Sequence, residues 1–326
     1  MVKVSIIIPH FNRFNLLEET ILSVINQTYK YWEIIIVDDG SQENEFKCLK
    51  NYDGKNNIKV FERKNEKKGP SSCRNIGIKN AVGDYIIFLD SDDLLAPFCL
   101  EQRINVVLEN PSVNIAVFLI ENFTSVIGDT KAIFNKIVPK EELSSFFLKN
   151  ENPWQTMAPI WKKDFILSLG GFDEDLIFME DPEMHLRAIN SKAVNMKLCY
   201  NEPADCYYRI SNMDVTKNEF YFNSIFYRIL FYKKILSEKQ NCNYVKENLP
   251  NIKFGIYKLV STFLYARSQE FPKLLDEFET FIKTCNLFTH FELFRLLFLL
   301  KVGNSKSLIA KKLKIKGICF KLLPKS

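Results

Sequence analysis

The chain has 326 residues, of which 47% are hydrophobic, and a formal net charge of +5 at neutral pH. Its length is sufficient for roughly two domains, and its apolar content excludes a chain that is disordered throughout. The basic excess lies at one end, because residues 301–326 contain eight lysines and no acidic residue. The rest of the chain holds 36 basic and 39 acidic residues. This balance argues against a broad nucleic-acid-binding surface, and we expect no nucleic-acid partner.

The eight cysteines are scattered along the chain, without a Cys-x-x-Cys pair or a zinc-finger spacing. The chain passes from Met1 almost directly into a strand-like segment, and no apolar signal segment precedes it. Free thiols in a reducing compartment are the simplest account of this cysteine usage. We therefore expect a cytoplasmic protein.

The first 120 residues alternate between strand-like and helix-like segments. Short apolar runs rich in β-branched residues predict strands at residues 4–8, 34–37, 58–61, 85–89 and 115–119. A helix is expected between each of the first strands, including one over residues 71–81. Strands that alternate with helices predict an α/β fold with a mainly parallel sheet and helices on both faces.

The pattern changes twice further along the chain. Between about residues 154 and 210 we expect a turn at Gly170-Gly171, a helix over 182–190 and short strands at 196–200 and 206–209. Beyond about residue 215, helical patterns rich in Phe, Tyr, Leu and Lys dominate. The second half therefore predicts an α+β segment followed by a helical region.

Three aspartates in Asp90-Ser91-Asp92-Asp93 directly follow the apolar run 85–89. Carboxylates this close together repel one another, and a divalent cation that prefers hard oxygen ligands would neutralise them. The carboxyl ends of strands in an open α/β sheet are also where ligands bind. A turn whose aspartates cap the next helix, with Pro97 at its first position, explains these four residues equally well.

Three other polar segments follow expected strands. Pro9-His10-Phe11-Asn12 offers an aromatic ring that either stacks on a base or packs locally. Asp38-Asp39-Gly40-Ser41 offers a carboxylate for a base N–H or a ribose hydroxyl, or forms an Asp-Gly turn. Arg74 lies near the start of the helix at 71–81, and both helix N-termini and arginines favour phosphate. The glycine-rich fingerprints of dinucleotide-binding and P-loop proteins are missing from the sequence.

A candidate general base lies in the second half. Pro182 suits the first position of a helix, which makes Asp181 the expected N-cap residue. A capping carboxylate on a helix that faces the ligand crevice would also be available to accept a proton from a hydroxyl group. His185 lies one turn further into the same helix, where a single histidine is more often structural than catalytic.

Taken together, these motifs show that the chain resembles the glycosyltransferase family 2 enzymes, which are inverting transferases of GT-A fold. The matching segments are VSIIIPHFN (4–12), SVINQT (23–28), IVDDGS (36–41), CRNIG (73–77), DSDD (90–93), GGFDE (170–174) and ED (180–181). Each segment is a weak signal alone, but all seven in this order are specific. The resemblance covers about residues 3–210.

The resemblance implies a nucleotide-sugar site in the first half. Pro9 and Phe11 would line the base pocket, and Asp39 would hold the uracil of a UDP-sugar with Asp38 beside it. Arg74 would contact the nucleotide or its diphosphate. The other residues expected in this site are Asn12, Asp90 and Ser91.

The resemblance also implies a cation and a catalytic base. Asp90 and Asp92 match the family's Asp-x-Asp element, with Asp92 as the direct ligand of Mn²⁺ or Mg²⁺. Asp181 would be the base that activates an acceptor hydroxyl for in-line attack on the anomeric carbon, with inversion. The residues expected on the acceptor side are Trp154, Glu180, His185 and Arg209. The expected product is a hexosyl or N-acetylhexosaminyl linkage to a glycan or lipid-linked glycan.

The chain departs from the family pattern at three positions. Phe11 stands where tyrosine is more common, which retains stacking but removes a hydroxyl. Cys73 replaces a frequent alanine. After Arg209 the chain lacks the histidine that many members carry, so the resemblance does not assign the residue that closes over the phosphates on that side.

These motifs lead to a division of the chain into a GT-A catalytic domain over residues 1–212 and a helical region over 213–326. The nucleotide-binding half would cover about residues 1–120 and the acceptor half about 121–212. Two other functions remain open at this point. One is a nucleotidyltransferase that forms nucleotide-sugars, which would need a glycine-rich loop after the first strand. The other is a non-catalytic sugar-nucleotide-binding protein of the same fold.

The C-terminal region lies outside the resemblance. Phe291–Leu300 is apolar but too short to span a bilayer, and the lysines of 301–326 follow it. Apolar residues beside unopposed lysines suit the surface of an anionic membrane, so we expect peripheral contact with the inner face of the membrane through residues 291–326. The alternative is a helical appendage, docked on the catalytic domain or forming an oligomer, with a solvated basic end. The oligomeric state is left open.

Overall fold

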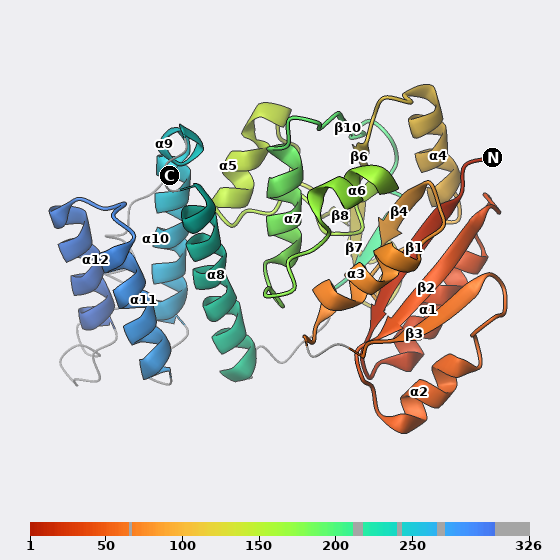
Figure 1. Ribbon diagram of the computed structural model, residues 1–326, viewed down its shortest axis with the longest axis horizontal. Coiled ribbons are helices and arrows are strands. Elements are labelled where there is room, and N and C mark those ends of the chain that lie inside the picture. Colours follow the sequence, from red (N-terminus) through yellow and green to blue (C-terminus); the bar gives the residue numbers. More distant parts are fainter. Residues whose placement is uncertain (65–66, 211–217, 240–242, 266–270, 304–326) are drawn as a thin grey trace. The chain divides into compact units, whose positions relative to one another are not determined.

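The computed structural model describes residues 1–64, 67–210, 218–239, 243–265 and 271–303 (Figure 1). The chain divides into two compact units. The first unit comprises Met1–Leu143 and Asn152–Asn212, and the second comprises Ser144–Glu151 and Met213–Ser326. Most of the basic tail at 301–326 lies outside the described residues.

The first unit contains a seven-stranded sheet with the order β10-β6-β9-β4-β1-β2-β3. Its strands are β1 (Val4–His10), β2 (Trp32–Asp38), β3 (Ile58–Glu62), β4 (Tyr85–Phe88), β6 (Ile115–Val117), β9 (Pro159–Lys162) and β10 (Met196–Leu198). The pairs β1–β2, β1–β4, β2–β3 and β6–β10 are parallel. This confirms the predicted α/β fold with a mainly parallel sheet.

Strand β9 differs from the prediction, because it lies antiparallel between β4 and β6. It is four residues long, begins with Pro159 and follows a segment without strand-like alternation. Its sequence, Pro-Ile-Trp-Lys, has only two apolar residues between a proline and a lysine, so it forms neither an apolar run nor a clear alternation. The antiparallel strand therefore emerges only from its pairing with two strands that are distant in the chain.

A second sheet of four strands, in the order β5-β11-β7-β8, was not expected. It consists of β5 (Leu94–Leu95), β7 (Ile120–Phe123), β8 (Ala132–Ile133) and β11 (Cys206–Arg209). Only the strand at 206–209 was predicted, because β5 and β8 are two residues long. The antiparallel pairing of β11 with β5 brings the residues after Cys206 beside the segment that follows Asp93.

The helices of the first unit connect these strands. They are α1 (Phe14–Ile25), α2 (Glu43–Lys50), α3 (Pro70–Asn80), α4 (Cys99–Glu109), α6 (Lys163–Leu169), α7 (Glu180–Ile189) and the 3₁₀ helix η1 (Lys140–Glu142). Helix α3 packs against β1 and β2 (Figure 1). Gly77 allows this approach, because a Cβ atom there would lie 2.3 Å from Ile7 Cγ2. The close contact of α3 with the sheet positions Arg74.

Two predictions about helix starts were wrong. Helix α7 begins at Glu180 and is preceded by Met179 in the left-handed conformation, at φ 69°. Asp181 is therefore the second residue of the helix and not its N-cap, and Pro182 is the third. A proline is tolerated throughout the first turn, where the amides lack helical acceptors, so Pro182 did not define the first position. Helix α4 likewise begins at Cys99, two residues after Pro97.

The described part of the second unit is mainly helical. Besides α5 (Leu143–Leu148), its helices are α8 (Asn218–Lys239), α9 (Asn243–Glu247), α10 (Leu249–Tyr265), α11 (Pro272–Thr284) and α12 (His290–Gly303). Figure 1 shows α8, α10, α11 and α12 side by side, and each contacts its neighbours. The Tyr232 hydroxyl donates to the Leu148 carbonyl at 2.8 Å, which is one reason that 144–151 groups with these helices. None of the described helices is both long and apolar enough to cross a bilayer.

Candidate functional site

The centre of the site is the side chain of Arg74, which joins three carboxylates from two other segments. Its Nη2 donates to Asp90 Oδ1 at 2.7 Å, and its Nη1 donates to Asp181 Oδ1 at 3.1 Å and Glu180 Oε1 at 3.2 Å. Asp90 follows β4, whereas Glu180 and Asp181 are the first two residues of α7. The tertiary fold thus gathers four of the residues that the sequence predicted for the site.

The cluster is held in place from α3 and from the loop before α7. Asn75 donates to the Phe172 carbonyl at 2.9 Å and accepts from the Phe172 amide at 2.8 Å. A Cβ atom at Gly171, which has φ 75°, would lie 2.5 Å from Asn75 Oδ1. The Arg74 guanidinium lies over the Phe172 ring, 5.2 Å from its centroid. The GGFDE segment therefore supports Arg74 rather than supplying the carboxylates of the cluster.

Burial determines the protonation of the two carboxyl groups on α7. Burial raises the pKa of Asp181 to about 6, while the charge of Arg74 and hydrogen bonding by Thr156 oppose this rise. Burial and the charge of Asp181 together raise the pKa of Glu180 to about 8, and Arg74 again opposes the rise. At neutral pH, Asp181 is thus the group that is ionised and able to accept a proton.

Asp39 lies at the N-terminal end of α3. Its carboxylate pairs with the Arg63 side chain and accepts from the Gly69 amide at 3.0 Å. The Cys73 thiol also lies 3.7 Å from Asp39 Oδ1. Arg63 was not predicted, although it follows the third strand directly, as the other site residues follow theirs. The Asp39 carboxylate is therefore placed beside the helix that carries Arg74.

Asp38 is buried and organises the loops after β1 and β2. It lies 2.9 Å from His10 Nδ1 and accepts from the Gly40 amide at 3.0 Å and the Ser41 amide at 2.9 Å. Burial raises its pKa, but the hydrogen bonds from His10 and Ser41 outweigh this effect, so the pKa of Asp38 lies below its usual range. Asp38 thus acts mainly on the loop conformation.

The loop after β1 leaves Phe11 accessible. Asn12 has φ 49°; its amide donates to Ser41 Oγ at 2.9 Å, and its Oδ1 accepts from the Gln42 amide at 2.8 Å. These bonds join the loop to the one that follows β2. The Phe11 ring is 52% exposed, and Pro9 is the penultimate residue of β1. An exposed ring on an anchored loop is suited to stacking against a planar ligand.

Asp92 and Asp93 lie beside Arg209 from β11. The Arg209 Nε donates to the Asp92 carbonyl at 2.8 Å, and its backbone amide donates to Asp93 Oδ1 at 2.8 Å. The Asp92 carboxylate pairs with Arg13 at 2.8 Å. Ser91, which precedes Asp92 in the chain, is buried. The structure therefore brings Arg209, from the far end of the first unit's sequence, to the Asp90–Asp93 segment.

The carboxylate oxygens of the Asp90–Asp93 segment are ligands of the type that a divalent cation prefers. Burial, followed by the charge of Asp90, raises the pKa of Asp92, and burial raises that of Asp93 still further. Among the described residues, no group of three His, Cys, Asp or Glu side chains forms a ready metal cluster. Mg²⁺ is commonly held by one or two carboxylates together with substrate phosphates. Asp90 and Asp92 suit a cation of that kind because their side chains are 37% and 21% exposed, although each pairs with an arginine, whereas Asp93 is buried against β11.

Trp154 and His185 form an aromatic layer behind the cluster. The His185 ring stacks on Trp161, with centroids 5.7 Å apart, and lies 5.6 Å from the Trp154 ring. Both Trp154 and His185 are buried. Burial lowers the pKa of His185 to about 3, and the charge of Arg74 contributes to this. His185 is therefore neutral, and the place of both residues on the acceptor side stays a prediction.

Three residues near the site were missed by the sequence reasoning. They are Arg13, Arg63 and Thr156, which contact Asp92, Asp39 and Asp181 respectively. Arg13 and Arg63 each follow a strand. A search for basic residues after the predicted strands would therefore have identified them. Thr156 lies in a loop segment without a distinguishing pattern, and only the fold brings it to Asp181.

The family model for "Glycosyl transferase family 2" matches residues 5–166 of the chain. An uncharacterized glycosyltransferase of Haemophilus influenzae is 31% identical over 222 residues, which cover 67% of this chain and 83% of that protein. An uncharacterized glycosyltransferase of Rickettsia conorii is 46% identical over 108 residues. That match covers 33% of this chain but only 18% of the relative, so the chain spans less than a fifth of its length.

The chain is also similar to a relative whose activity is named and, separately, to a protein of solved structure. The UDP-Glc:alpha-D-GlcNAc-diphosphoundecaprenol beta-1,3-glucosyltransferase of Escherichia coli is 35% identical over 148 residues, which cover 45% of this chain and 55% of that enzyme. The structure of Staphylococcus aureus TarS 1-349 in complex with UDP-GlcNAc has a TM-score of 0.65 at 17% identity. It covers 98% of this chain and 91% of that chain, which shows a common fold.

Proposed function

The chain belongs to glycosyl transferase family 2, and we propose that it is a metal-dependent, inverting glycosyltransferase. It transfers a hexosyl or N-acetylhexosaminyl group from a UDP-sugar to a hydroxyl group of a glycan or lipid-linked glycan. The observation that carries this proposal is the contact of Arg74 with both Asp90 and Asp181. This contact supports the proposal because Asp181, the proposed base, and Asp90, one of the two carboxylates proposed for the cation, share one guanidinium.

Asp181 is the proposed general base. Its carboxylate is ionised at neutral pH because its pKa, although raised, remains at about 6. It accepts the proton of the acceptor hydroxyl while the oxygen attacks the anomeric carbon. The bond from that carbon to the diphosphate oxygen breaks on the opposite face, and the nucleoside diphosphate leaves with the bonding electrons. Attack and departure on opposite faces invert the anomeric configuration.

Asp92 and Asp90 are the proposed residues for Mn²⁺ or Mg²⁺. When bound, such a cation neutralises the negative charge that develops on the departing diphosphate. Arg74 has a second part in this arrangement, because its guanidinium faces Asp90 and both carboxyl groups of α7. It holds them at short distances that their mutual repulsion would otherwise oppose.

The proposed nucleotide contacts come from Phe11 and Asp39, and the classes of donor and acceptor come from a relative. The exposed Phe11 ring is proposed to stack on the uracil, and Asp39 to accept a hydrogen bond from it. The E. coli relative is named for a UDP-glucose donor and an acceptor linked to diphosphoundecaprenol. A donor and an acceptor of these two classes are therefore the ones to test first.

Release of UDP tests the proposal. The purified chain is incubated with single UDP-sugars and Mn²⁺ or Mg²⁺, with and without a GlcNAc-diphosphate-lipid acceptor, and the product is examined by mass spectrometry and NMR. Acceptor-dependent release of UDP with an inverted linkage is expected. A product with the donor's anomeric configuration would contradict the mechanism. In a separate incubation with UTP and a sugar 1-phosphate, formation of a UDP-sugar with release of diphosphate would instead support the nucleotidyltransferase alternative.

A further inference from the structure

Helix α12 of the second unit has two apolar faces. Leu296, Leu299 and Leu300 are buried within the unit. On another side, Phe291, Phe294 and Phe298 are 74%, 67% and 52% exposed. Their spacing of three and four residues places them along one side of the helix, and the Phe294 and Phe298 rings stack at 6.2 Å. We refer to these three side chains as the phenylalanine face.

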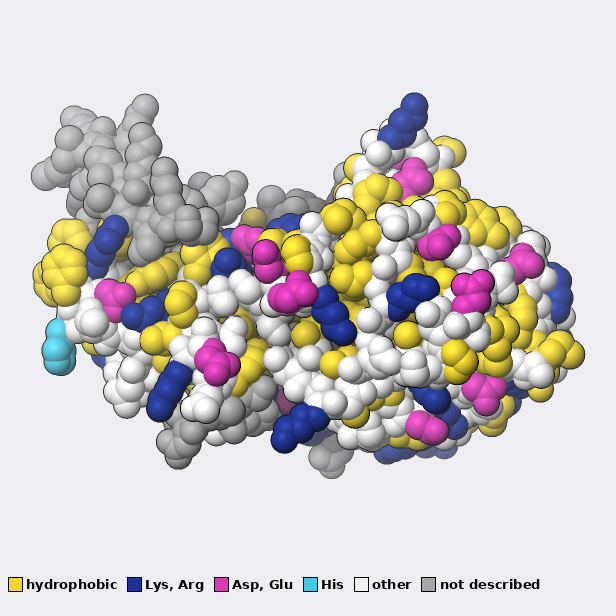
Figure 2. All heavy atoms as spheres, turned by 90° about the horizontal axis from the view of Figure 1, so that it is seen from above, with side chains coloured by type: hydrophobic (Ala, Val, Ile, Leu, Met, Phe, Trp, Pro, Cys, Tyr) yellow, Lys and Arg dark blue, Asp and Glu magenta, His cyan; other side chains and the backbone are white. Residues whose placement is uncertain are grey.

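The phenylalanine face is unusual for a surface in contact with water. Single exposed apolar side chains are common, but grouped ones mark a site of interaction. Figure 2 shows hydrophobic side chains gathered at the surface over α12, at the left of the view. The buried leucines already attach α12 to its unit. Most of the surface of these three rings therefore faces solvent, where a partner could cover it.

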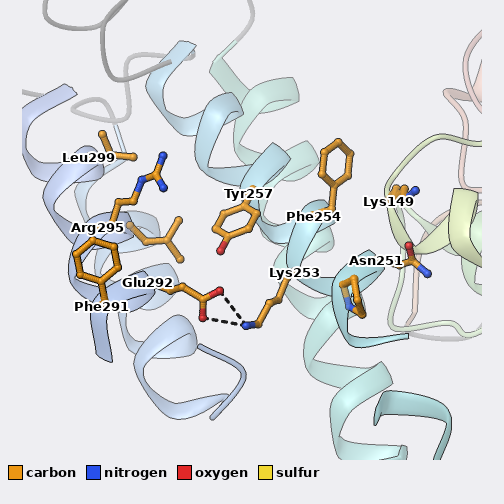
Figure 3. A pocket seen from close by; sticks show the side chains of 11 residues that line it. Lys149, Asn251, Lys253, Phe254, Tyr257, Phe291, Glu292, Arg295 and Leu299 are labelled. Carbon is orange, nitrogen blue, oxygen red and sulfur yellow. Dashed lines mark hydrogen bonds and ion pairs between the residues drawn. The ribbon is translucent and has the colours of Figure 1, made fainter. Parts of the chain in front are cut away.

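A pocket of about 480 Å³ adjoins this face. It lies within the second unit and is lined by residues of α10 and α12 and by Lys149, and Phe291 belongs both to the pocket and to the phenylalanine face. The pocket also contains Lys253, Arg295 and one acidic residue, Glu292 (Figure 3). Three cationic groups against one carboxylate give the pocket a positive charge.

The cations of the pocket are only partly neutralised. Lys253 pairs with Glu292 at 2.8 Å. Within the described residues, Lys149 and Arg295 have no carboxylate partner; Lys149 instead lies over the Phe254 ring, 5.8 Å from its centroid. Arginine and lysine without a carboxylate are suited to a phosphate group. The pocket thus offers a polar site for an anion directly beside exposed aromatic rings.

Basic residues flank the phenylalanine face on α12 and follow it in the sequence. Helical spacing places Arg295 and Lys301 on either side of the three rings. The sequence from residue 304 to the C-terminus adds seven lysines and no acidic residue. A second copy of the chain would bring these like charges together, which is unfavourable. A negatively charged surface with an apolar interior matches both the rings and the cations.

We propose that the phenylalanine face docks on the surface of an anionic membrane and that the pocket of Lys149, Lys253 and Arg295 accepts a phospholipid phosphate. Aromatic rings are favoured at the boundary between lipid headgroups and acyl chains. Basic groups near an anionic surface add to the binding. This inference goes beyond the proposed function, because it concerns α12 and not the sugar chemistry.

Vesicle co-sedimentation of the full chain tests the inference. The lipid is either phosphatidylcholine alone or phosphatidylcholine mixed with phosphatidylglycerol. The wild-type protein should bind the mixed vesicles and bind the neutral ones weakly, and added salt should release it. Phe294→Ser combined with Phe298→Ser should lower the partition coefficient about tenfold, because the rings lose apolar contact. Arg295→Gln should lower it about fivefold, which corresponds to about 1 kcal/mol for one basic group.

Two matched variants control for surface changes in general. Leu108→Ser alters an exposed apolar side chain of α4, and Lys283→Gln alters an exposed lysine of α11. Neither should change vesicle binding. UDP release with a soluble acceptor should be the same for the phenylalanine variant and the wild type. A wild-type protein that binds anionic vesicles but transfers no sugar would contradict the proposed function and leave this inference intact.

Four results would overturn the inference. Equal binding to neutral and anionic vesicles would remove the electrostatic argument. Unchanged binding of the phenylalanine variant would assign the membrane contact to another part of the chain. Self-association that is lost in this variant, without vesicle binding by the wild type, would make the face a contact between copies. Release from vesicles by inorganic phosphate, but not by chloride at the same ionic strength, would assign the pocket to a free anion.

Discussion

The Arg74 guanidinium lies 3.1 Å from the Asp181 carboxylate, although 107 residues separate the two in the chain. The same guanidinium holds Asp90 at 2.7 Å. Helix α3 therefore joins the end of β4 to the start of α7 through one buried side chain. The protonation of Asp181 depends on this arrangement, because burial and the charges of Arg74 and Asp90 all act on its carboxyl group.

Asp181→Asn should abolish sugar transfer while leaving UDP binding close to that of the wild type. Asparagine preserves the shape of the side chain but does not accept a proton, and general-base catalysis contributes on the order of 10²–10⁴-fold in rate. Acceptor-dependent UDP release and calorimetric UDP titration measure the two properties. Asp175→Asn is a matched control, since Asp175 is an exposed aspartate that pairs with Lys67. Full turnover by Asp181→Asn would exclude this residue as the base.

The rate should depend on pH through the same carboxyl group. Burial raises the pKa of Asp181 to about 6, and the ionised form is the one that accepts a proton. Activity is therefore lost as pH falls through this pKa, and kcat/KM should decrease about tenfold per pH unit below it. A profile of kcat/KM against pH at fixed metal concentration measures the acid limb. A flat profile down to about pH 5 would argue against a buried carboxylate base.

Arg74→Gln should move that acid limb to higher pH, because it removes the positive charge that lowers the pKa of Asp181. It should also lower the free energy of unfolding by at most about 3 kcal/mol, since the carboxylates lose their partner. This loss in the free energy of unfolding is smaller than for a fully buried ion pair, because the Asp90 side chain is 37% exposed. Arg74→Lys keeps the charge and should leave the limb near its original pH. Chemical denaturation and pH profiles of both variants provide the test.

Asp92→Ala should remove the stimulation of transfer by Mn²⁺ or Mg²⁺ together with most of the activity. The cation would lose its proposed direct ligand, and the diphosphate would leave without neutralisation of its charge. Titration of activity with each metal, and of UDP affinity with and without metal, measures the effect. Asp175→Asn should retain the metal response. A metal response of normal size in Asp92→Ala would place the cation elsewhere.

Arg103→Leu should lower the free energy of unfolding by about 3–5 kcal/mol. Arg103 and Asp205 are both fully buried and joined by two hydrogen bonds, at 2.7 Å and 2.8 Å. The substitution leaves the Asp205 carboxylate buried without its ionic partner, directly before β11. Combining it with Asp205→Leu should recover part of the loss, because two apolar groups need no compensation. Urea denaturation of the single and double variants measures both effects. A small loss in the single variant would show that the contact does not act as a buried ion pair.

The periodicity of the sequence is sufficient to predict the α/β class and the main strands of the first unit. Runs such as Val4–Ile8 are buried on both faces, so they contain few polar residues to interrupt the pattern. The carboxyl ends of these strands identify Asp39 and Asp90 as site candidates, since such ends meet at one edge of a parallel sheet, and Arg74 is identified by its place near the start of a helix. That part of the site follows from local pattern and general topology.

Short elements were not predictable in this way. Strands β5 and β8 have two residues each, which is too few for a periodic signal, and β9 reads Pro-Ile-Trp-Lys, which lacks a strand-like pattern. Their existence depends on pairing with distant strands. The position of Arg209 beside Asp92 follows from the pairing of β11 with β5 and β7, so it too was beyond the reach of sequence reasoning.

The sequence by itself therefore determined the fold class, the order of the motifs and the residue types available for chemistry. Only the tertiary structure decided that Arg74 contacts Asp181, that Asp181 lies inside α7, and that Phe294 and Phe298 remain exposed on α12. The physical reason is that each of these properties depends on which surfaces come into contact. Gly77 permits the approach of α3 to β1. The sequence around Arg74, however, does not specify which carboxylates its guanidinium contacts.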